Sequence, residues 1–201
     1  MGGDARFIIY GTLPTGRAGA APARRAAAFL DRDGVLNIDH GHVHKPQNFD
    51  WVAGAAAAVR RLSDLGYCII VVTNQSGIAR GLYDDATFKA LSDWMVAELG
   101  AQGGRIDAVY YCPHHPTAGL GALRMTCDCR KPAPGMLLAA MDAWHIDGGS
   151  SFFIGDKDTD LAAAAAAGVR GLLFSGGNLD EFIRRSLSAL PAIPEDQGAT
   201  S

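Results

Sequence analysis

Short apolar runs alternate along this chain with longer segments in which apolar and polar residues mix. The apolar runs are rich in β-branched and aromatic residues, which predicts buried strands near residues 26–31, 67–72, 106–111, 151–155 and 170–174. The segments between them predict helices, several opened by Asp, Pro or Asn at capping positions, over residues 53–65, 84–99, 134–145, 157–167 and 178–189. This alternation predicts an α/β fold with a doubly wound, Rossmann-like parallel sheet covered on both faces.

The two ends of the chain depart from this pattern. Residues 1–25 form a Gly- and Ala-rich leader whose apolar stretch, residues 6–10, is compatible with an edge strand or with a mobile arm. Residues 191–201 have the composition of a flexible tail. We therefore expect a single domain over residues 26–190.

Composition narrows the class of protein. The chain has 201 residues, of which 48% are hydrophobic and 19% charged, so it can bury a sizeable core. Its formal net charge of −3 and its lack of a long basic run argue against binding to nucleic acid or to a membrane surface. No apolar stretch approaches the length of a membrane span, and no secretory signal opens the chain. We expect a cytoplasmic monomer.

Two carboxylates follow the first predicted strand. Asp31 and Asp33 stand two positions apart, and Gly34 then allows a sharp turn. Open α/β sheets place their ligands at the carboxyl ends of the strands, where Asp31 would lie. One carboxylate can attack phosphorus while the other protonates the leaving oxygen and later activates water. The pair predicts phosphoryl transfer with Asp31 as nucleophile and Asp33 as acid/base.

Polar groups follow two further strand ends. The second strand leads into residues 73–76, where a hydroxyl and successive backbone N–H groups could hold phosphate oxygens. Lys131 precedes a predicted helix and could neutralise the phosphoryl charge.

A dense group of acids follows the fourth strand. Magnesium prefers oxygen ligands and keeps some of its waters, so Asp31, Asp156 and the main-chain carbonyl of Asp33 would suffice to bind Mg²⁺. Asp160 is a candidate for orienting these groups, whereas Asp158 is expected to be solvated.

Three of the four cysteines gather in one loop. Cys112, Cys127 and Cys129, together with a histidine, supply the number and softness of ligands for a closed tetrahedral zinc site. On spacing alone, either His114 or His115 could complete the set. Closed ligation leaves no open position, which predicts a structural Zn²⁺ in a loop over residues 112–130.

These motifs occur in the order of the four motifs of the haloacid dehalogenase superfamily, which the chain resembles. Within it, the chain is similar to the family of D-glycero-D-manno-heptose-1,7-bisphosphate 7-phosphatases. The likeness runs from about residue 28 to residue 174 and includes four longer, more specific blocks at Asp39–His42, Thr73–Gly81, Tyr110–Pro116 and Cys127–Pro132.

The resemblance implies a magnesium-dependent phosphatase that removes the 7-phosphate through an aspartyl-phosphate. It implies that Thr73 and Lys131 stabilise the transferring group and that His114 is the fourth zinc ligand. His42 departs from the family pattern, which usually has tyrosine there. The substrate contacts that it implies are Asp39, His40, Gly41, His42, Thr73, Asn74, Gln75, Ser76, Arg130 and Lys157.

The spacing of the motifs also predicts how the site is covered. About 20 residues separate Asp31 from the first helix, too few for the helical cap that many relatives insert there. We expect a capless site closed only by loops, in which zinc fixes the positions of Arg130 and Lys131.

Two alternatives remain open at this point. The nearest is histidinol-phosphate phosphatase, a related member of the superfamily that shares the zinc loop and the catalytic set. The other is a non-catalytic, zinc-stabilised module that binds a sugar phosphate or a protein. The joint presence of Asp31, Asp33, Lys131 and Asp156 favours an enzyme.

Overall fold

The chain forms one six-stranded sheet, seen in a computed structural model that describes residues 6–14 and 23–188. The order of the strands across the sheet is β1-β4-β3-β2-β5-β6. Five strands run parallel, and β1 pairs antiparallel with β4 at one edge. The strands are β1 (Arg6–Ile9), β2 (Ala27–Leu30), β3 (Cys68–Asn74), β4 (Ala108–Cys112), β5 (Phe152–Gly155) and β6 (Arg170–Leu173). The predicted doubly wound parallel sheet is confirmed.

The end segments have different outcomes. Arg6–Ile9 is an edge strand, as one of the two interpretations of the leader predicted. Residues 1–5 and 15–22 of that leader, and the tail predicted at 191–201, lie outside the described residues.

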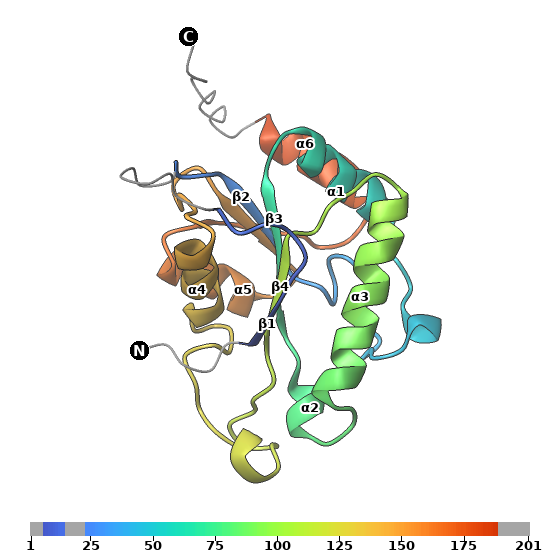
Figure 1. Cartoon of the computed structure of the whole chain (residues 1–201), viewed down its shortest axis with the longest axis vertical. Coiled ribbons are helices and arrows are strands. Elements are labelled where there is room, and N and C mark those ends of the chain that lie inside the picture. Colours follow the sequence, from blue (N-terminus) through green and yellow to red (C-terminus); the bar gives the residue numbers. More distant parts are fainter. Residues whose placement is uncertain (1–5, 15–22, 189–201) are drawn as a thin grey trace.

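Helices cover both faces of the sheet (Figure 1). On one face lie α1, α3 and α6, and on the other lie α4 and α5. The helices are α1 (Ala55–Asp64), α2 (Ser76–Ala79), α3 (Asp85–Ala101), α4 (Gly135–Ala143), α5 (Asp158–Ala166) and α6 (Leu179–Leu187), with 3-10 turns η1 (Pro46–Asn48) and η2 (Gly121–Leu123). None of the helices in the described ranges is long and apolar enough to cross a membrane.

The central strands are apolar on both faces, as a sheet covered by helices requires. All four residues of β2 are buried, with Ala28 and Leu30 in the core under α1, α3 and α6 and Ala27 and Phe29 in the core under α4 and α5. Side chains of a strand alternate between faces, so this short run contributes to both cores. β2 is thereby anchored at the centre of the sheet, directly before Asp31.

Side chains cap two of the helices. Asp84 accepts a hydrogen bond from the backbone N–H of Thr87 at the start of α3, and Asn178 accepts one from Glu181 at the start of α6. These caps satisfy N–H groups that have no partner within the helix. α2 was not predicted, because residues 73–77 suggested a turn; it is a single short turn that follows β3 directly.

The connection between β2 and α1 contains no helical cap. Residues 31–54 hold only η1 and short bridges, including one between Asp33 and Asn37 and one between Asn37 and Trp51. The expectation of a capless domain is confirmed over this segment. The residues that follow β2 therefore face an opening bounded by loops.

Candidate active site

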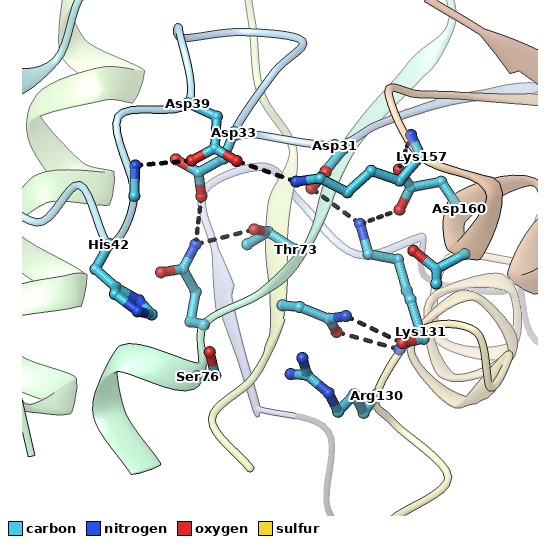
Figure 2. A pocket seen from close by; sticks show the side chains of 14 residues that line it. Asp31, Asp33, Asp39, His42, Thr73, Ser76, Arg130, Lys131, Lys157 and Asp160 are labelled. Carbon is cyan, nitrogen blue, oxygen red and sulfur yellow. Dashed lines mark hydrogen bonds and ion pairs between the residues drawn. The ribbon is translucent and has the colours of Figure 1, made fainter. Parts of the chain in front are cut away.

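A cavity of about 380 Å³ lies at the carboxyl ends of the parallel strands (Figure 2). Its lining combines acids, cations and amides from segments far apart in the sequence. The residues that line it are Asp31, Asp33, Asp39, Gly41, His42, Thr73, Asn74, Gln75, Ser76, Arg130, Lys131, Lys157, Thr159 and Asp160. This position is the one at which open α/β sheets bind ligands.

Asp31 sits directly after β2, and its backbone N–H still donates to the carbonyl of Ile154 on β5, at 2.9 Å. Its Oδ1 accepts a hydrogen bond from the backbone N–H of Arg32 at 2.8 Å. Burial raises the pKa of Asp31 to about 7, although the nearby Lys131 acts in the opposite direction. Ionisation of Asp31 is therefore unfavourable in this buried position unless positive charge lies close to its carboxylate.

Lys131 supplies part of that charge from within the protein. Its Nζ lies 2.9 Å from Oδ1 of Asp31 and 2.7 Å from Oδ1 of Asp160, and it donates to the carbonyl of Val72 at 2.9 Å. Burial alone would lower the pKa of Lys131, but the two carboxylates raise it. Asn74 exchanges two hydrogen bonds of 3.1 Å with the backbone of Lys131, which fixes the lysine to the end of β3.

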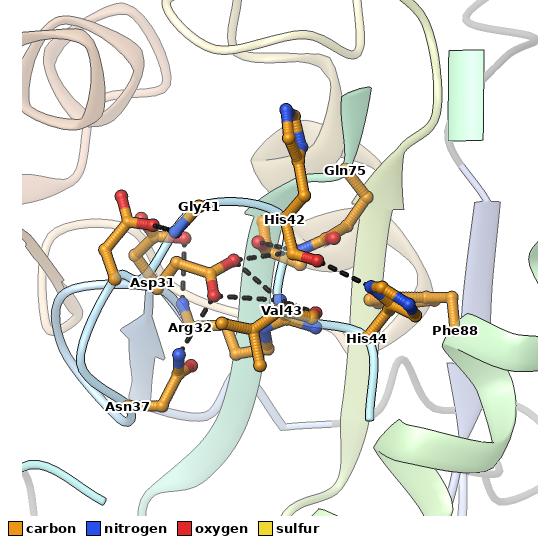
Figure 3. Close-up of polar contacts among 12 residues, drawn as sticks. Asp31, Arg32, Asn37, Gly41, His42, Val43, His44, Gln75 and Phe88 are labelled. Carbon is orange, nitrogen blue, oxygen red and sulfur yellow. Dashed lines mark hydrogen bonds and ion pairs between the residues drawn. The ribbon is translucent and has the colours of Figure 1, made fainter. Parts of the chain in front are cut away.

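Asp33 is held by the side chains of three residues that Figure 3 labels, Arg32, Asn37 and Gln75. Nη2 of Arg32 lies 2.8 Å from each of its carboxylate oxygens. Asn37 donates to Oδ1 at 3.0 Å, and Gln75 donates to Oδ2 at 3.0 Å. The carboxylate remains 16% exposed, at the cavity.

Three carboxylates lie close enough to share a cation. One oxygen each from Asp31, Asp156 and Asp160 falls within 4.8 Å of the others. Asp160 is already engaged, since Lys131 pairs with Oδ1 and the backbone N–H of Lys157 donates to Oδ2 at 3.1 Å. Oδ1 of Asp156 is buried and has no hydrogen-bond partner among the described residues. A hard cation with oxygen ligands would satisfy this atom, so the donor set fits a divalent metal.

Gly34 leaves the space that Asp156 occupies. Its φ is +96°, a region that disfavours other residues, and a Cβ there would lie 2.2 Å from Oδ2 of Asp156. The turn after Asp33 therefore requires glycine for its backbone conformation and for its close contact with the acid.

A second cluster of possible metal ligands lies beside the cavity. Sulfur–sulfur distances among Cys112, Cys127 and Cys129 are 3.1, 3.2 and 3.5 Å, and Nδ1 of His114 lies 3.4 Å from the Cys129 sulfur. A tetrahedral ion about 2.3 Å from each sulfur would separate them by about 3.8 Å, so the cluster can close on one metal with little movement. His114 is the histidine of this cluster, whereas Nδ1 of His115 accepts N–H bonds from its own loop.

The loop that carries this cluster also supplies a cation to the cavity. Nη1 of Arg130 donates to the carbonyl of His114 at 3.2 Å, and Arg130 lines the cavity together with the neighbouring Lys131. This hydrogen bond ties Arg130 to the loop of the Cys/His cluster, and Lys131 is the next residue along the chain.

The opposite rim is formed by the loop after β2. Asp39 accepts from the backbone N–H of Gly41 at 3.0 Å, and its other oxygen lies 3.0 Å from Nζ of Lys157. His42 adopts a positive φ of 52° and lines the cavity. The loop thus brings an imidazole and an ion pair to the mouth of the site.

The structure brings together most of the residues singled out from the sequence. His40 is not among the lining residues, and its Nε2 lies 2.7 Å from Oδ2 of Asp50. Asp156 is not among the lining residues either, but one of its oxygens lies within 4.8 Å of oxygens of Asp31 and Asp160.

Two residues in and around this cavity were not predicted from the sequence. Thr159 lines it, and Arg32 lies buried beneath it with a side chain 1% exposed. An arginine between two aspartates suggests a solvated side chain, so no local signal marked Arg32. The sequence indicated only an orienting role for Asp160; its spacing of four residues from Asp156, across a helix start, is the signal that places both acids together.

The arrangement can perform phosphoryl transfer. It places one buried carboxylate beside an ammonium, a second carboxylate within the same cavity, and a possible metal site that includes the first carboxylate. A nucleophile, an acid/base and groups that neutralise phosphoryl charge are the parts this reaction needs.

Comparisons with known proteins agree with this chemistry. The family described as HAD-hydrolase-like matches residues 128–193. The chain is 46% identical to the D-glycero-β-D-manno-heptose-1,7-bisphosphate 7-phosphatase of Rhodopseudomonas palustris, over 84% of this chain and 93% of the relative. It is 45% identical to the enzyme of the same name from Escherichia coli K12, over 85% of this chain and 95% of the relative.

A solved structure is similar as well. The crystal structure of the D,D-heptose 1,7-bisphosphate phosphatase from B. bronchiseptica, complexed with magnesium and phosphate, aligns with a TM-score of 0.68 and 37% identity. The alignment covers 85% of this chain and 89% of that protein.

Proposed function

Because this chain belongs to the haloacid dehalogenase-like phosphatases, in the family of the heptose-1,7-bisphosphate 7-phosphatases, we propose that it removes the 7-phosphate of D-glycero-β-D-manno-heptose 1,7-bisphosphate. One observation carries the proposal. Asp31, Asp33, Thr73 and Lys131, which come from three separate segments, line one cavity with Arg130 and Lys157 at its rim. Both the β anomer and the 7-phosphate are proposed from the names of the relatives.

The reaction has two halves. An Asp31 oxygen attacks phosphorus, the bond from phosphorus to the sugar oxygen breaks, and the proton of Asp33 goes to that leaving oxygen. Asp33 then takes a proton from water as the water oxygen attacks the aspartyl-phosphate, which releases orthophosphate and restores the Asp31 carboxylate. The order requires Asp33 to be protonated in the first half and ionised in the second.

Thr73 and Lys131 stabilise the transferring phosphoryl group. The hydroxyl of Thr73 stands at the end of β3 and Lys131 beside Asp31, so both can reach oxygens on phosphorus. Negative charge spreads over these oxygens during transfer, and preorganised donors stabilise it at little reorganisation cost.

Magnesium would be held by Asp31, Asp156 and the carbonyl of Asp33. When bound, it supplies positive charge that offsets the repulsion between the phosphate and the buried carboxylates. The unpartnered Oδ1 of Asp156 supports this assignment.

The rim of the cavity recognises the rest of the substrate. Arg130 and Lys157 present two cations that suit the second, non-reacting phosphate, and Arg130 can bind it with two parallel hydrogen bonds. The cavity-lining residues Asp39, Gly41 and His42 would contact the sugar, together with Asn74 and Ser76, which line the same cavity. His40 would join these contacts only if its ring left Asp50.

Zinc occupies the Cys/His cluster in this proposal and has a structural role. Cys112, His114, Cys127 and Cys129 would supply all four of its ligands, so a bound zinc would leave no position for substrate. Its effect on catalysis is exerted through the placement of Arg130 and Lys131. We further place the enzyme in the cytoplasm as a monomer, where a soluble sugar phosphate would reach it.

The test is phosphate release in the presence of magnesium. The two anomers of D-glycero-D-manno-heptose 1,7-bisphosphate are compared with histidinol phosphate and fructose 1,6-bisphosphate, with Asp31→Asn as control. We expect the β heptose to be preferred and the variant to be inactive but folded, with its zinc retained. Preference for histidinol phosphate would reassign the substrate, activity of Asp31→Asn would refute the covalent mechanism, and release from none of the four esters would favour a binding module.

A further inference from the structure

We propose that Arg32, Gln75 and Tyr83 form a clamp that fixes the carboxylate of Asp33, so that these three are positioning residues for the acid/base. Arg32 and Gln75 are labelled in Figure 3. The inference rests on the proposed function, because it assigns the clamp to the proton-transfer group of that reaction. None of the three needs to touch the reacting phosphorus.

Arg32 forms one side of the clamp. Its side chain is 1% exposed, and its Nη2 contacts both oxygens of Asp33 at 2.8 Å and the carbonyl of Val43 at 2.7 Å. The guanidinium carbon stands 5.6 Å from the ring centre of Phe88, in a cation–π contact. Within the described chain, Nε and Nη1 have no hydrogen-bond partner. Burying a guanidinium in this way is costly, and its ion pair with Asp33 offsets that cost.

The same residue also orients the nucleophile. The backbone N–H of Arg32 donates to Oδ1 of Asp31 at 2.8 Å while its side chain holds Asp33. Arg32, which is buried, therefore contacts both carboxylates and holds them in place relative to one another. This relationship constrains the distance between the attacking oxygen and the group that protonates the leaving oxygen.

Gln75 forms the other side. Its Nε2 donates to Oδ2 of Asp33 at 3.0 Å and to Oγ1 of Thr73 at 2.9 Å. A glutamine amide has a donor end and an acceptor end, so its orientation must be selected. The hydroxyl of Tyr83 donates to Oε1 of Gln75 at 2.6 Å, which directs the NH₂ group toward the active site.

Tyr83 is itself held firmly. It is 8% exposed, and its ring stacks on His44 with centres 4.9 Å apart and planes inclined by 13°. A Cβ on Gly77 would lie 2.2 Å from Cε1 of this ring, so the start of α2 packs directly on it. The loop that carries His44 and the helix that carries Gly77 thus fix the hydroxyl on which Gln75 depends.

The capless architecture explains the need for such a clamp. Residues 31–54 contain no cap helix that could close over Asp33 and hold it. The carboxylate must protonate a leaving oxygen and later accept a proton from water at nearly the same place. Rotating it away would break the hydrogen bonds from Asn37 and Gln75 and leave the buried Arg32 without its ion-pair partner.

The test compares two leaving groups. p-Nitrophenolate leaves without a proton, whereas a sugar alkoxide needs one, and kcat/KM reports only the steps up to departure of the leaving group. For Tyr83→Phe we expect kcat/KM on the heptose bisphosphate to fall roughly tenfold and that on p-nitrophenyl phosphate to fall less than about twofold. For Arg32→Met the fall on the sugar ester should be about 100-fold, with partial rescue in Arg32→Lys.

Controls separate positioning from general damage. Tyr10→Phe removes a hydroxyl that donates to Asp93 at 2.9 Å, away from the cavity, and should leave both substrates unaffected. Inhibition by orthophosphate should be unchanged in Tyr83→Phe, because the phosphate-binding groups stay in place. If kcat/KM of Tyr83→Phe fell equally on both esters, or fell on neither, the clamp would be refuted. This outcome does not depend on whether Arg32→Met folds.

Failure of the proposed function would look different. A wild-type protein that does not hydrolyse the heptose ester would sink that substrate assignment. The clamp could still be tested with any alkyl phosphate that the protein hydrolyses. The loss of kcat/KM in each variant would be compared between that ester and p-nitrophenyl phosphate.

Discussion

The ammonium of Lys131 lies 2.9 Å from the carboxylate of Asp31, and the two side chains are only 3% and 7% exposed. The pair is shared with Asp160, whose Oδ1 lies 2.7 Å from the same nitrogen. One cation thus serves two buried carboxylates. Removal of that cation would leave two buried carboxylates without an ion-pair partner. The resulting loss of stability is larger than the net contribution of the intact ion pair to folding.

Lys131→Met should therefore lower both stability and activity. We expect the free energy of unfolding to fall by about 3 to 5 kcal/mol, because two buried carboxylates lose their partner. Turnover should fall at least about 100-fold through the loss of charge beside phosphorus. Urea unfolding and phosphate release measure the two effects. Unchanged stability in the variant would contradict the buried pairing, and Arg60→Met, on an exposed residue, is the control.

Cys127→Ser tests the Cys/His cluster. Loss of one thiolate should reduce the bound zinc, destabilise the loop over 112–130 and lower turnover together, because the loop places Arg130 and Lys131. Metal content is measured by elemental analysis alongside thermal unfolding and activity. Cys68→Ser is the matched control, since Cys68 is buried elsewhere and lies outside the cluster. Zinc content that stays the same in Cys127→Ser would remove it from the ligand set.

Gly34→Ala should weaken magnesium binding. The added Cβ would lie 2.2 Å from Oδ2 of Asp156, so the acid must move, and we expect the magnesium concentration for half-maximal activity to rise roughly tenfold. Gly66→Ala is the matched control, because its φ of +79° carries a similar strain while no atom lies within 4 Å of the new Cβ. Equal magnesium dependence in the two variants would argue against contact between Gly34 and a metal ligand.

Asp180→Asn should destabilise the protein in a pH-dependent manner. Nε and Nη2 of Arg61 contact the two oxygens of Asp180 at 2.6 and 2.9 Å, tying α1 to α6, and hold the pKa of this carboxyl below its usual value of 3.8. Because the pKa of Asp180 is lower in the folded protein than in the unfolded chain, its ionisation stabilises the fold at pH values above the unfolded-state pKa. This stabilisation is lost as the pH falls through the folded-state pKa.

The free energy of unfolding of the variant should thus be lower than that of wild type by about 0.5 to 1 kcal/mol near neutral pH. This difference is small because the ion pair is partly exposed to solvent. The difference from wild type should shrink as the pH falls below 3.8, the ordinary value for this carboxyl. Urea unfolding at several pH values measures it. Asp64→Asn, which breaks an exposed contact of 3.8 Å with Arg60, should show little difference, and a constant deficit in Asp180→Asn at all pH values would refute the linkage.

Much of the site could be predicted from the order and spacing of residues along the chain. Asp31, Thr73 and Lys131 follow apolar runs or precede a helix, and parallel strands bring such positions to one edge of the sheet. Cys112 and His114, separated from Cys127 and Cys129 by a loop, indicate a metal cluster through spacing alone. Position along the chain could not decide between His114 and His115, because neighbouring residues have nearly the same spacing from the cysteines. In the folded loop His114 lies in the cluster, whereas Nδ1 of His115 accepts a hydrogen bond from the backbone of Ala118.

Periodicity and composition are local properties, so the residues alone predict the alternation of strands and helices, the order of the motifs and the kinds of chemical group available. Which of these groups share a low-dielectric space depends on how the chain folds. Folding placed Arg6–Ile9 at the sheet edge, buried Arg32 against Asp33, and joined Asp160 of α5 to Lys131, which precedes α4. Burial and ion pairing depend on atoms far apart in the chain, so they exist only once the sheet has assembled and excluded water.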